Sequence, residues 1–338
     1  MSQRRGPAGW QIAALSVAGA GAALAAANWL TRVGLRAPEH ALRGSEALYP
    51  WTEGTIHYAA RGRGEPMLLL HDLFPGSSAF EYRQVFAPLA ERYRVFAPDL
   101  LGFGRSGHPA IRYTPQLYAT LTEDLLRQVV GATDQPAHLV AAGRSAGFAV
   151  LAASARPQLV RSLTLIEPIG LLAPSAERAA PDAQAGLRLG PQVARALLRT
   201  PLLGESAYHA LVSRWGLRRA LRRRLADGAA HAGRVSDDVI DQYYAMAHQR
   251  GARFASADLL GAMDSAEASA AFEELSAPTL LIWGQRDPSH PIAECRALRQ
   301  RRPSAQLRVF PTGAMPHVEA PDAFAREVFG WLRVAVRV

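Results

Sequence analysis

The sequence predicts an α/β fold in which helices flank a mostly parallel sheet, with an inserted helical segment and an N-terminal membrane helix. Three observations carry this prediction. Short apolar runs alternate with longer helical patterns, which is the arrangement of a parallel sheet with helices on both faces. One run leads through Gly143 and Ser145 into an alanine-rich helix, and residues 10–30 contain no formal charge.

Residues 1–9 form a basic tail, with Arg4 and Arg5 before the uncharged stretch. Residues 10–30 are long enough to span a bilayer as a helix at about 1.5 Å per residue. We therefore expect a transmembrane anchor. The alanines of residues 23–27 also suit a signal peptidase, so a cleaved signal peptide and a merely apolar soluble helix stay open as alternatives. Arginines flank both sides, so the positive-inside rule gives no orientation.

Residues 31–47 read as a linker because they contain Pro38, Gly44 and scattered charges. The first part of the core, residues 48–169, and the second part, residues 274–338, hold the expected strands. Each run is short, almost wholly apolar and bounded by Gly, Pro, Asp or His, as strands buried on both faces are. The runs are residues 67–70, 93–97, 138–142, 163–166, 279–283 and 307–310, and the helices expected between them include 84–92, 115–130 and 146–155.

Residues 170–273 interrupt this alternation with about a hundred residues of helical pattern. An insert at this point is expected over the carboxyl ends of the strands, where open α/β sheets place their sites. We interpret it as a helical lid. One of its helices, residues 215–225, is basic and amphipathic, which suits either an anionic membrane surface or a packed helix with a solvated arginine face. A second, residues 237–249, has an apolar side that can line a pocket.

The composition argues against several classes of protein. With 338 residues and 49% hydrophobic content, the chain has a sizeable core. The net charge of +9 comes mostly from arginine, but no nucleic-acid-binding pattern accompanies it, so we expect no nucleic-acid partner. Cys295 is the single cysteine and excludes an intramolecular disulfide framework. The sequence implies no cofactor and no metal.

The strongest motif is Gly143-Arg144-Ser145-Ala146-Gly147, between an apolar strand and a helix. A serine on a sharp strand-to-helix turn is held in a strained backbone conformation, and small neighbours let the helix pass the strand. This pattern predicts a nucleophile elbow that presents Ser145. The alternative is that Ser145 is only a small residue required by a tight turn.

Four motifs together resemble the α/β-hydrolase fold family from about Thr52 to the C-terminus. They are the oxyanion-type loop at residues 68–72, with Asp72 where glycine is usual, the turn at 97–106, the elbow at 143–147 and the turn at 283–287. The resemblance implies that Asp287 is the acid of a catalytic triad, although an aspartate there also caps helices. Glu167 is the runner-up. We expect the backbone N–H groups of Leu73 and Ala146 to stabilise an oxyanion.

The family's usual histidine is missing. Residues 313–319 read Gly-Ala-Met-Pro-His-Val-Glu, so Ala314 stands where the catalytic histidine is expected and His317 follows three residues later. A serine needs an adjacent base, which a carboxylate holds in the right tautomer. We assign this base to His317, unless it is a solvated residue in the first turn of a helix. His290 follows Asp287 too closely to complete a triad with it.

These residues predict a membrane-associated serine hydrolase of ester or other acyl bonds, with catalytic Ser145, Asp287 and His317, an apolar acyl substrate and membrane lipid as partners. An alternative is a catalytically impaired pseudo-hydrolase that acts as a binding or scaffold protein. A cofactor-free lyase on the same scaffold is a third possibility. The sequence does not separate the three.

Overall fold

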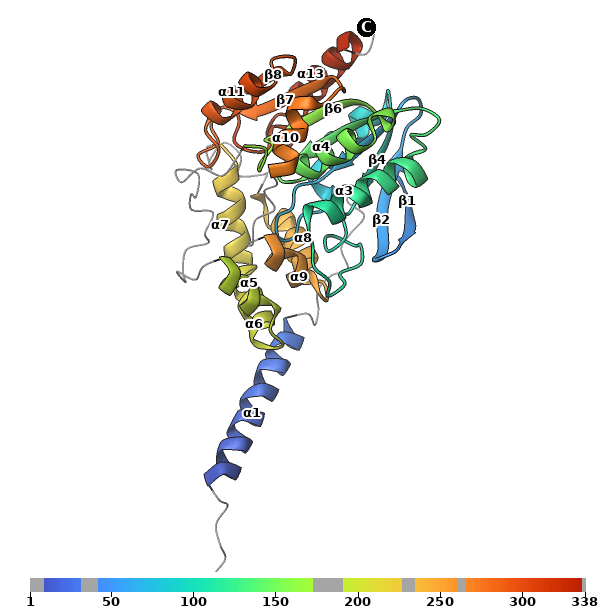
Figure 1. The fold of residues 1–338 in the computed structure, drawn as a ribbon. Coiled ribbons are helices and arrows are strands. Elements are labelled where there is room, and N and C mark those ends of the chain that lie inside the picture. Colours follow the sequence, from blue (N-terminus) through green and yellow to red (C-terminus); the bar gives the residue numbers. More distant parts are fainter. Residues whose placement is uncertain (1–8, 32–41, 173–190, 227–234, 260–265, 336–338) are drawn as a thin grey trace, which may run out of the picture.

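An eight-stranded sheet forms the centre of the protein (Figure 1). The computed structural model describes residues 9–31, 42–172, 191–226, 235–259 and 266–335. The strands lie in the order β1-β2-β4-β3-β5-β6-β7-β8, and β3 to β8 run parallel. They are β1 (Ser45–Trp51), β2 (Gly54–Arg61), β3 (Pro66–Leu70), β4 (Arg94–Pro98), β5 (Ala137–Ala142), β6 (Val160–Ile166), β7 (Thr279–Gly284) and β8 (Gln306–Phe310).

The six parallel strands predicted from apolar runs are confirmed. The hairpin of β1 and β2 is an addition to that prediction, and β1 begins at Ser45, inside the range expected to be a linker. These two strands pair antiparallel with each other, and β2 pairs antiparallel with β4. β1 is an edge strand with several exposed side chains, which tolerates Pro50 because a proline there breaks no inner ladder. Its mixed exposure is why no apolar run marks it.

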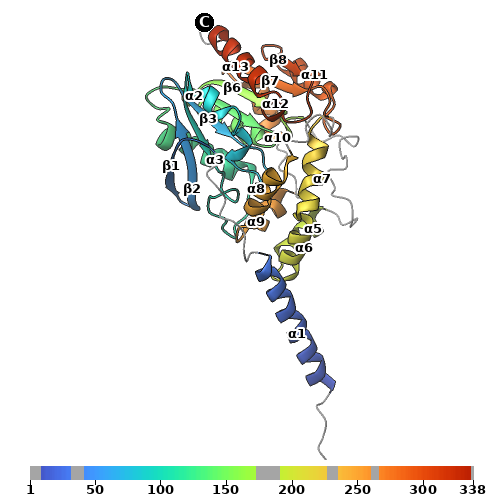
Figure 2. The same ribbon diagram turned by 180° about the vertical axis from the view of Figure 1, so that it is seen from behind.

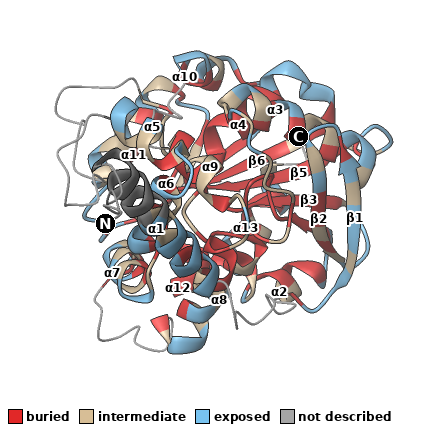
Figure 3. Cartoon of the chain, turned by 90° about the horizontal axis from the view of Figure 1, so that it is seen from below, coloured by how far each residue is buried: buried red, intermediate tan, exposed pale blue. Residues whose placement is uncertain are grey.

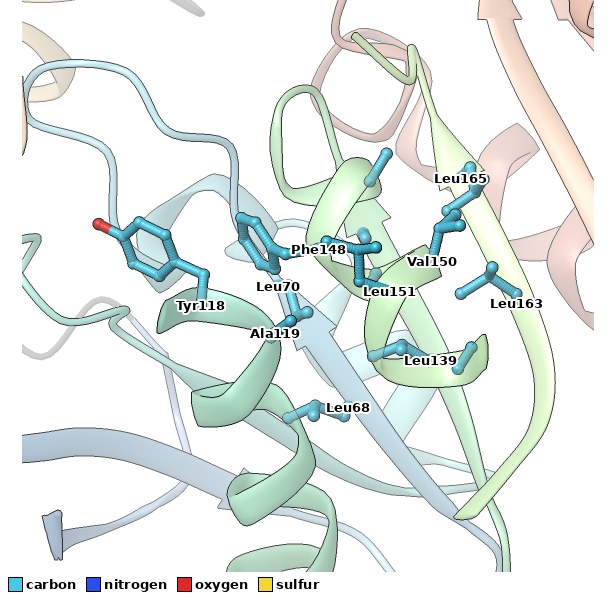
Figure 4. Packing of buried hydrophobic residues seen from close by; sticks show 14 of the residues in the cluster. Leu68, Leu70, Tyr118, Ala119, Leu139, Phe148, Val150, Leu151, Leu163 and Leu165 are labelled. Atoms are coloured by element: carbon cyan, nitrogen blue, oxygen red, sulfur yellow. The ribbon is translucent and has the colours of Figure 1, made fainter. Parts of the chain in front are cut away.

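Helices cover both faces of the sheet. α3 (Pro115–Asp124), which continues into a π-helical turn, α4 (Ser145–Ala155) and α11 (Ile292–Arg301) bury side chains in the core on one face. α2 (Phe86–Ala90) and α13 (Pro321–Ala335) do so on the other face. Successive residues of a strand point to opposite faces of the sheet, so alternate side chains pack into the hydrophobic core on one face and into the core on the other. Figure 4 shows Phe148 and Leu151 of α4 beside the leucines of the strands below them.

Several short helical turns complete the core, and one helical insert separates β6 from β7. The turns are η1 (Ala79–Tyr82), η3 (Pro157–Leu159) and α12 (Pro316–Glu319). Its described helices are α5 (Pro191–Arg199), α6 (Leu203–Leu211), α7 (Arg214–Arg224), α8 (Asp237–Ala247), α9 (Ala252–Leu259) and α10 (Ala266–Glu274). Helices α5 to α9 gather at one end of the sheet (Figure 2), whereas α10 packs against α4 in the main core.

The uncharged N-terminal segment forms one helix, α1 (Gly9–Leu30), which extends away from the sheet beside α6 (Figures 1 and 2). Within the described residues, no helix is both long enough and apolar enough to cross a membrane. The expected transmembrane anchor is therefore unsupported. Alanine and glycine make up most of residues 19–30, and such residues contribute little to the free energy of membrane insertion. The expected tail and most of the linker lie outside the described residues.

Candidate active site

The left-handed residue in the turn between β5 and α4 is Gly143 rather than Ser145. Gly143 has a φ of +56°, in the left-handed region that favours glycine. Glu167 and Leu202 are the non-glycine residues with positive φ in the described chain, so Ser145 has an ordinary backbone and begins helix α4. The expected strain at Ser145 is therefore wrong. The tip of the elbow lies two residues earlier.

Ser145 is also buried. Its exposed fraction is 0%, and its hydroxyl donates a hydrogen bond to the backbone oxygen of His71 in the loop after β3. The expectation of an exposed serine is therefore wrong. In this structure the hydroxyl ties the start of α4 to the end of β3, and its proton is held by a carbonyl oxygen rather than by a base.

The carboxylate of Asp72 lies at the tip of the elbow. A Cβ added to Gly143 would overlap this carboxylate, so a side chain at position 143 would point to the place that Asp72 occupies. The backbone N–H groups of Leu73 and Arg144 both donate to Asp72 Oδ1, at 2.7 and 2.8 Å. In a nucleophile elbow the oxyanion hole consists of the N–H after the nucleophile and an N–H from the loop after β3. Leu73 and Arg144 are that pair for an elbow with its tip at residue 143.

The second predicted oxyanion donor has another partner. The N–H of Ala146 donates to the Gly143 carbonyl oxygen at 3.3 Å, within the turn itself. Arg144 takes the place expected for Ala146. The sequence holds a signal for this shift, because Ala141, Gly143 and Ser145 also follow the spacing of a small residue on either side of the tip.

An ion pair with the helical insert holds Asp72 in this position. The guanidinium of Arg224, at the end of α7, contacts Asp72 Oδ2. Burial by itself raises the pKa of Asp72, but the charge of Arg224 and the Arg144 N–H outweigh it and hold this pKa below its usual value. Asp72 therefore stays a carboxylate at neutral pH.

Glu81 completes this buried group. Its carboxyl accepts hydrogen bonds from the Asp72 N–H at 3.0 Å and from the Ser77 hydroxyl at 2.6 Å. Burial, followed by the nearby charge of Asp72, raises the pKa of Glu81 to about 7. Two carboxyl groups and one guanidinium thus lie around the turn where a hydrolase binds its oxyanion. Neither Glu81 nor Arg224 is marked by any motif.

His317 is buried in α12 without a hydrogen-bond partner among the described residues. Its ring packs against Tyr82 and Phe324, with centroid distances of 5.2 and 6.0 Å. Burial, together with the positive charges of Arg224 and Arg83, lowers its pKa to about 3, so the imidazole is neutral at pH 7. Neither ring nitrogen is bonded to the Ser145 hydroxyl or to Asp287 in this structure.

Ala314, at the place of the usual histidine, donates its N–H to the Arg224 carbonyl oxygen at 2.7 Å. The next residues of the insert are tied down as well, because the Ala226 N–H donates to Glu319 at 3.0 Å. The end of α7 therefore binds the loop between β8 and α12 through its backbone, and Asp72 through its side chain. The helical insert covers the site from this side.

Asp287 follows β7 and is buried, but its partners are local. It accepts the Ser289 N–H at 2.8 Å and pairs with His290 Nδ1 at 3.1 Å. Nearby, Glu167 has a positive φ of 45° and accepts the Gly284 N–H. Burial raises the pKa of Glu167 well above its usual range, and the charge of Asp287 adds to this. The structure thus brings Asp287 to His290 and Glu167 rather than to His317.

In the part of the chain that the structure describes, no group of three His, Cys, Asp or Glu side chains is placed to hold a metal ion.

Comparison with known proteins agrees with this architecture. The family model described as Alpha/beta hydrolase family matches residues 67–327. The chain belongs to the α/β hydrolase family. Among its relatives is a 2-hydroxymuconate semialdehyde hydrolase of Pseudomonas sp. (strain CF600), 28% identical over 287 residues that cover 81% of this chain and 89% of the relative.

Two solved structures show the same fold. A serine hydrolase involved in carbazole degradation has a TM-score of 0.67 at 20% identity, over 86% of this chain and 99% of its own. A membrane phospholipase A has a TM-score of 0.66 at 23% identity, over 97% of both chains. These likenesses show the fold, and a shared fold does not by itself assign the chemistry of the site.

Proposed function

We propose that this α/β hydrolase family member is catalytically impaired and uses its hydrolase-type site for binding. One observation carries the proposal. Asp72 Oδ1 accepts both the Leu73 and the Arg144 N–H, the two donors that a hydrolase of this family uses for the oxyanion of its substrate. An internal carboxylate thus occupies the position of the substrate's oxygen.

The other parts of the reaction are missing from the same place. Covalent hydrolysis needs a nucleophile at the elbow, a base beside it and a free oxyanion hole. Gly143 has no side chain, Ala314 has no base, and the negative charge of Asp72 repels a developing oxyanion. Removing the nucleophile or the base alone costs roughly 10⁶-fold in kcat where this has been measured, and the remaining activity comes from the oxyanion hole and binding. Here the oxyanion hole is filled too.

An apolar molecule is the ligand class that the surroundings favour. A small hollow beside α12 is lined mainly by apolar side chains of the insert and the core, including Leu221, Leu225, Tyr243, Met315 and Val318. The hollow itself, of about 10 Å³, has room for no more than a water molecule, so an apolar ligand has to move these side chains apart to bind here. Arg83 is the charged residue of this lining, and its guanidinium donates to the Phe80 carbonyl oxygen at 3.2 Å.

The second candidate is the serine hydrolase predicted from the sequence, with Ser145, His317 and Asp287. One observation favours it. Both ring nitrogens of His317 are buried without hydrogen-bond partners among the described residues, which is uncommon for a buried imidazole. An unbonded ring nitrogen is able to accept the proton of a hydroxyl group that moves next to it. In this alternative the Ser145 hydroxyl leaves the His71 carbonyl oxygen, and His317 accepts its proton while Asp287 orients the ring.

Labelling by a fluorophosphonate probe separates the two candidates. We expect the folded full chain to remain unlabelled and to leave a panel of acyl esters intact. Labelling that disappears in Ser145→Ala and His317→Ala, and weakens in Asp287→Asn, would overturn the proposal in favour of the second candidate. Circular dichroism and thermal unfolding of each variant show that it is folded.

Restoring the missing groups provides the converse test. The triple variant Gly143→Ser, Asp72→Gly, Ala314→His places a nucleophile at the tip, frees the N–H pair and returns the usual base. We expect it to react with the probe, and to do so still when Ser145→Ala is added as the matched control. A folded triple variant that stays unlabelled would argue against residue 143 as the reacting position.

A further inference from the structure

Exposed large apolar side chains gather at one end of the molecule. Within the described residues, ten large hydrophobic side chains are exposed. Seven of them belong to the end of α1, to α5, to α6 and the residue before it, or to the start of α7. We name these seven the α1–α6 face: Trp29, Leu30, Val193, Leu202, Leu203, Leu211 and Trp215. Single exposed apolar residues are ordinary, whereas a gathered set marks an interaction site.

The two tryptophans are the most telling members. Trp29 is 63% exposed and Trp215 is 72% exposed, although tryptophan carries the largest apolar side chain and one polar N–H. Figures 1 and 2 both place α1 beside α6 at the end of the insert away from the sheet. Seen from this end, α1 projects in front of the insert, and most of its described residues are exposed (Figure 3).

Polar contacts fix α1 to this face. Asn28 is buried, donates to the Leu202 carbonyl oxygen at 3.2 Å and accepts from the Ser206 hydroxyl at 2.9 Å. The Thr31 hydroxyl bonds to the His209 ring at 2.9 Å. Because these partners lie more than 170 positions apart in the chain, the contacts set the direction of α1 relative to the body. An uncharged helix therefore leaves the protein beside α6, close to exposed apolar side chains.

The positive charge of the insert indicates that the α1–α6 face contacts an anionic surface. Residues 191–226 contain eight arginines and one acidic residue, Glu205. Five of these arginines pair with aspartates elsewhere, and the exposed remainder, Arg219, Arg222 and Arg223, lies on α7. Basic residues near a surface of anionic lipids strengthen binding through electrostatic attraction. Tryptophan is enriched at the level of the lipid headgroups.

We propose that the α1–α6 face docks on the surface of an anionic lipid bilayer. Trp29 and Trp215 lie among the headgroups, and the leucines of α6 enter the boundary with the acyl chains. The exposed arginines of α7 contribute long-range attraction. This orientation places the helical insert, rather than the hairpin of β1 and β2, next to the lipid. The proposal is independent of whether the site hydrolyses or only binds its ligand.

Vesicle binding of the full chain tests the contact. The probes are vesicles of phosphatidylcholine with and without phosphatidylglycerol. We expect the double variant Leu203→Ser, Leu211→Ser to weaken binding about tenfold, because each substitution removes apolar surface from the contact with the lipid. The matched control is Leu48→Ser with Val334→Ser, which changes apolar residues outside the face that are at least as exposed and should leave binding unchanged. Arg222→Glu with Arg223→Glu should reduce the preference for phosphatidylglycerol.

Fluorescence quenching by brominated lipid locates the contact directly. Trp215 is one of six tryptophans, so the difference between the wild type and Trp215→Phe isolates its signal. We expect brominated lipid to quench that signal. An unquenched Trp215, or equal binding by the face variant and its control, would overturn the proposal. If the wild type instead shows a sedimentation coefficient that rises with concentration, and the variant Leu203→Ser, Leu211→Ser loses this dependence, the face joins two copies of the chain and the proposal is also overturned.

Discussion

Arg224 and Asp72 form an ion pair across 152 positions of the chain. The pair joins the helical insert to the loop after β3, and the same aspartate fills the two N–H donors of the elbow. The side chain of Asp72 is 3% exposed and that of Arg224 is 20% exposed. A single contact therefore both closes the site and neutralises a buried charge.

Removing the arginine should destabilise the protein strongly. We expect Arg224→Met to lower the free energy of unfolding by about 3 kcal/mol, because it leaves a buried carboxylate without its counter-charge. Arg223→Met, at the exposed neighbouring position, is the matched control and should change stability by less than about 0.5 kcal/mol. Urea unfolding measures both. Adding Asp72→Asn to Arg224→Met should recover part of the loss, and a purely additive double variant would show that the two groups are not coupled.

Gly143 offers a test of where the elbow lies. Gly143→Ala introduces a Cβ at positive φ that overlaps the Asp72 carboxylate. The matched control is Gly131→Ala, where φ is also positive at +75° but the nearest atom, Arg94 Nη2, is 3.9 Å away. Both variants share the backbone strain, of about 1 kcal/mol, so the difference between their unfolding free energies reports the overlap alone.

We expect Gly143→Ala to cost at least about 1 kcal/mol more than Gly131→Ala. In an Asp72→Gly background this excess should disappear, because the overlapping group is gone. An excess that survives Asp72→Gly would place the Asp72 carboxylate elsewhere.

Sequence predicts the parallel strands well because β3 to β7 are almost entirely buried and mostly apolar. The edge strand β8 is only partly buried and contains Gln306 and Arg308. Sequence misses β1 and β2, whose exposure varies along the edge of the sheet. The position of the elbow in the candidate site is harder to predict from the sequence. Gly-x-Ser-x-Gly points to Ser145, yet Gly143 fits an equivalent spacing, and only the backbone dihedral angles distinguish the two registers.

The contents of the oxyanion hole are beyond local sequence patterns. Asp72 stands out where glycine is usual, but the direction of its side chain depends on Arg224 and on the Arg144 N–H. Both lie far from Asp72 along the chain. Likewise, burial of His317 between Tyr82 and Phe324 depends on how α12 packs against η1 and α13. Long-range packing of this kind leaves no spacing to detect.

Glu81 should make the protein less stable as pH rises. Its pKa is about 7 in the folded state and near the usual 4.3 when unfolded. Between these values the folded state binds more protons, so this contribution is complete below about pH 4.3 and is lost as the pH rises toward 7. We expect the wild type to lose stability over this interval relative to Glu81→Gln. Glu91→Gln, at an exposed position, is the control and should follow the wild type.

His317 should act in the opposite direction. Its folded pKa is about 3, below the unfolded value of about 6.5, so the unfolded state binds more protons between these values. The contribution is present above about pH 6.5 and is lost on acidification, with a slope of up to about 1.4 kcal/mol per pH unit. We expect urea unfolding of His317→Leu to show a weaker acid dependence than that of the wild type. NMR titration of the imidazole checks the cause, and an ordinary pKa near 6.5 would mean that this ring is solvated rather than packed against Tyr82.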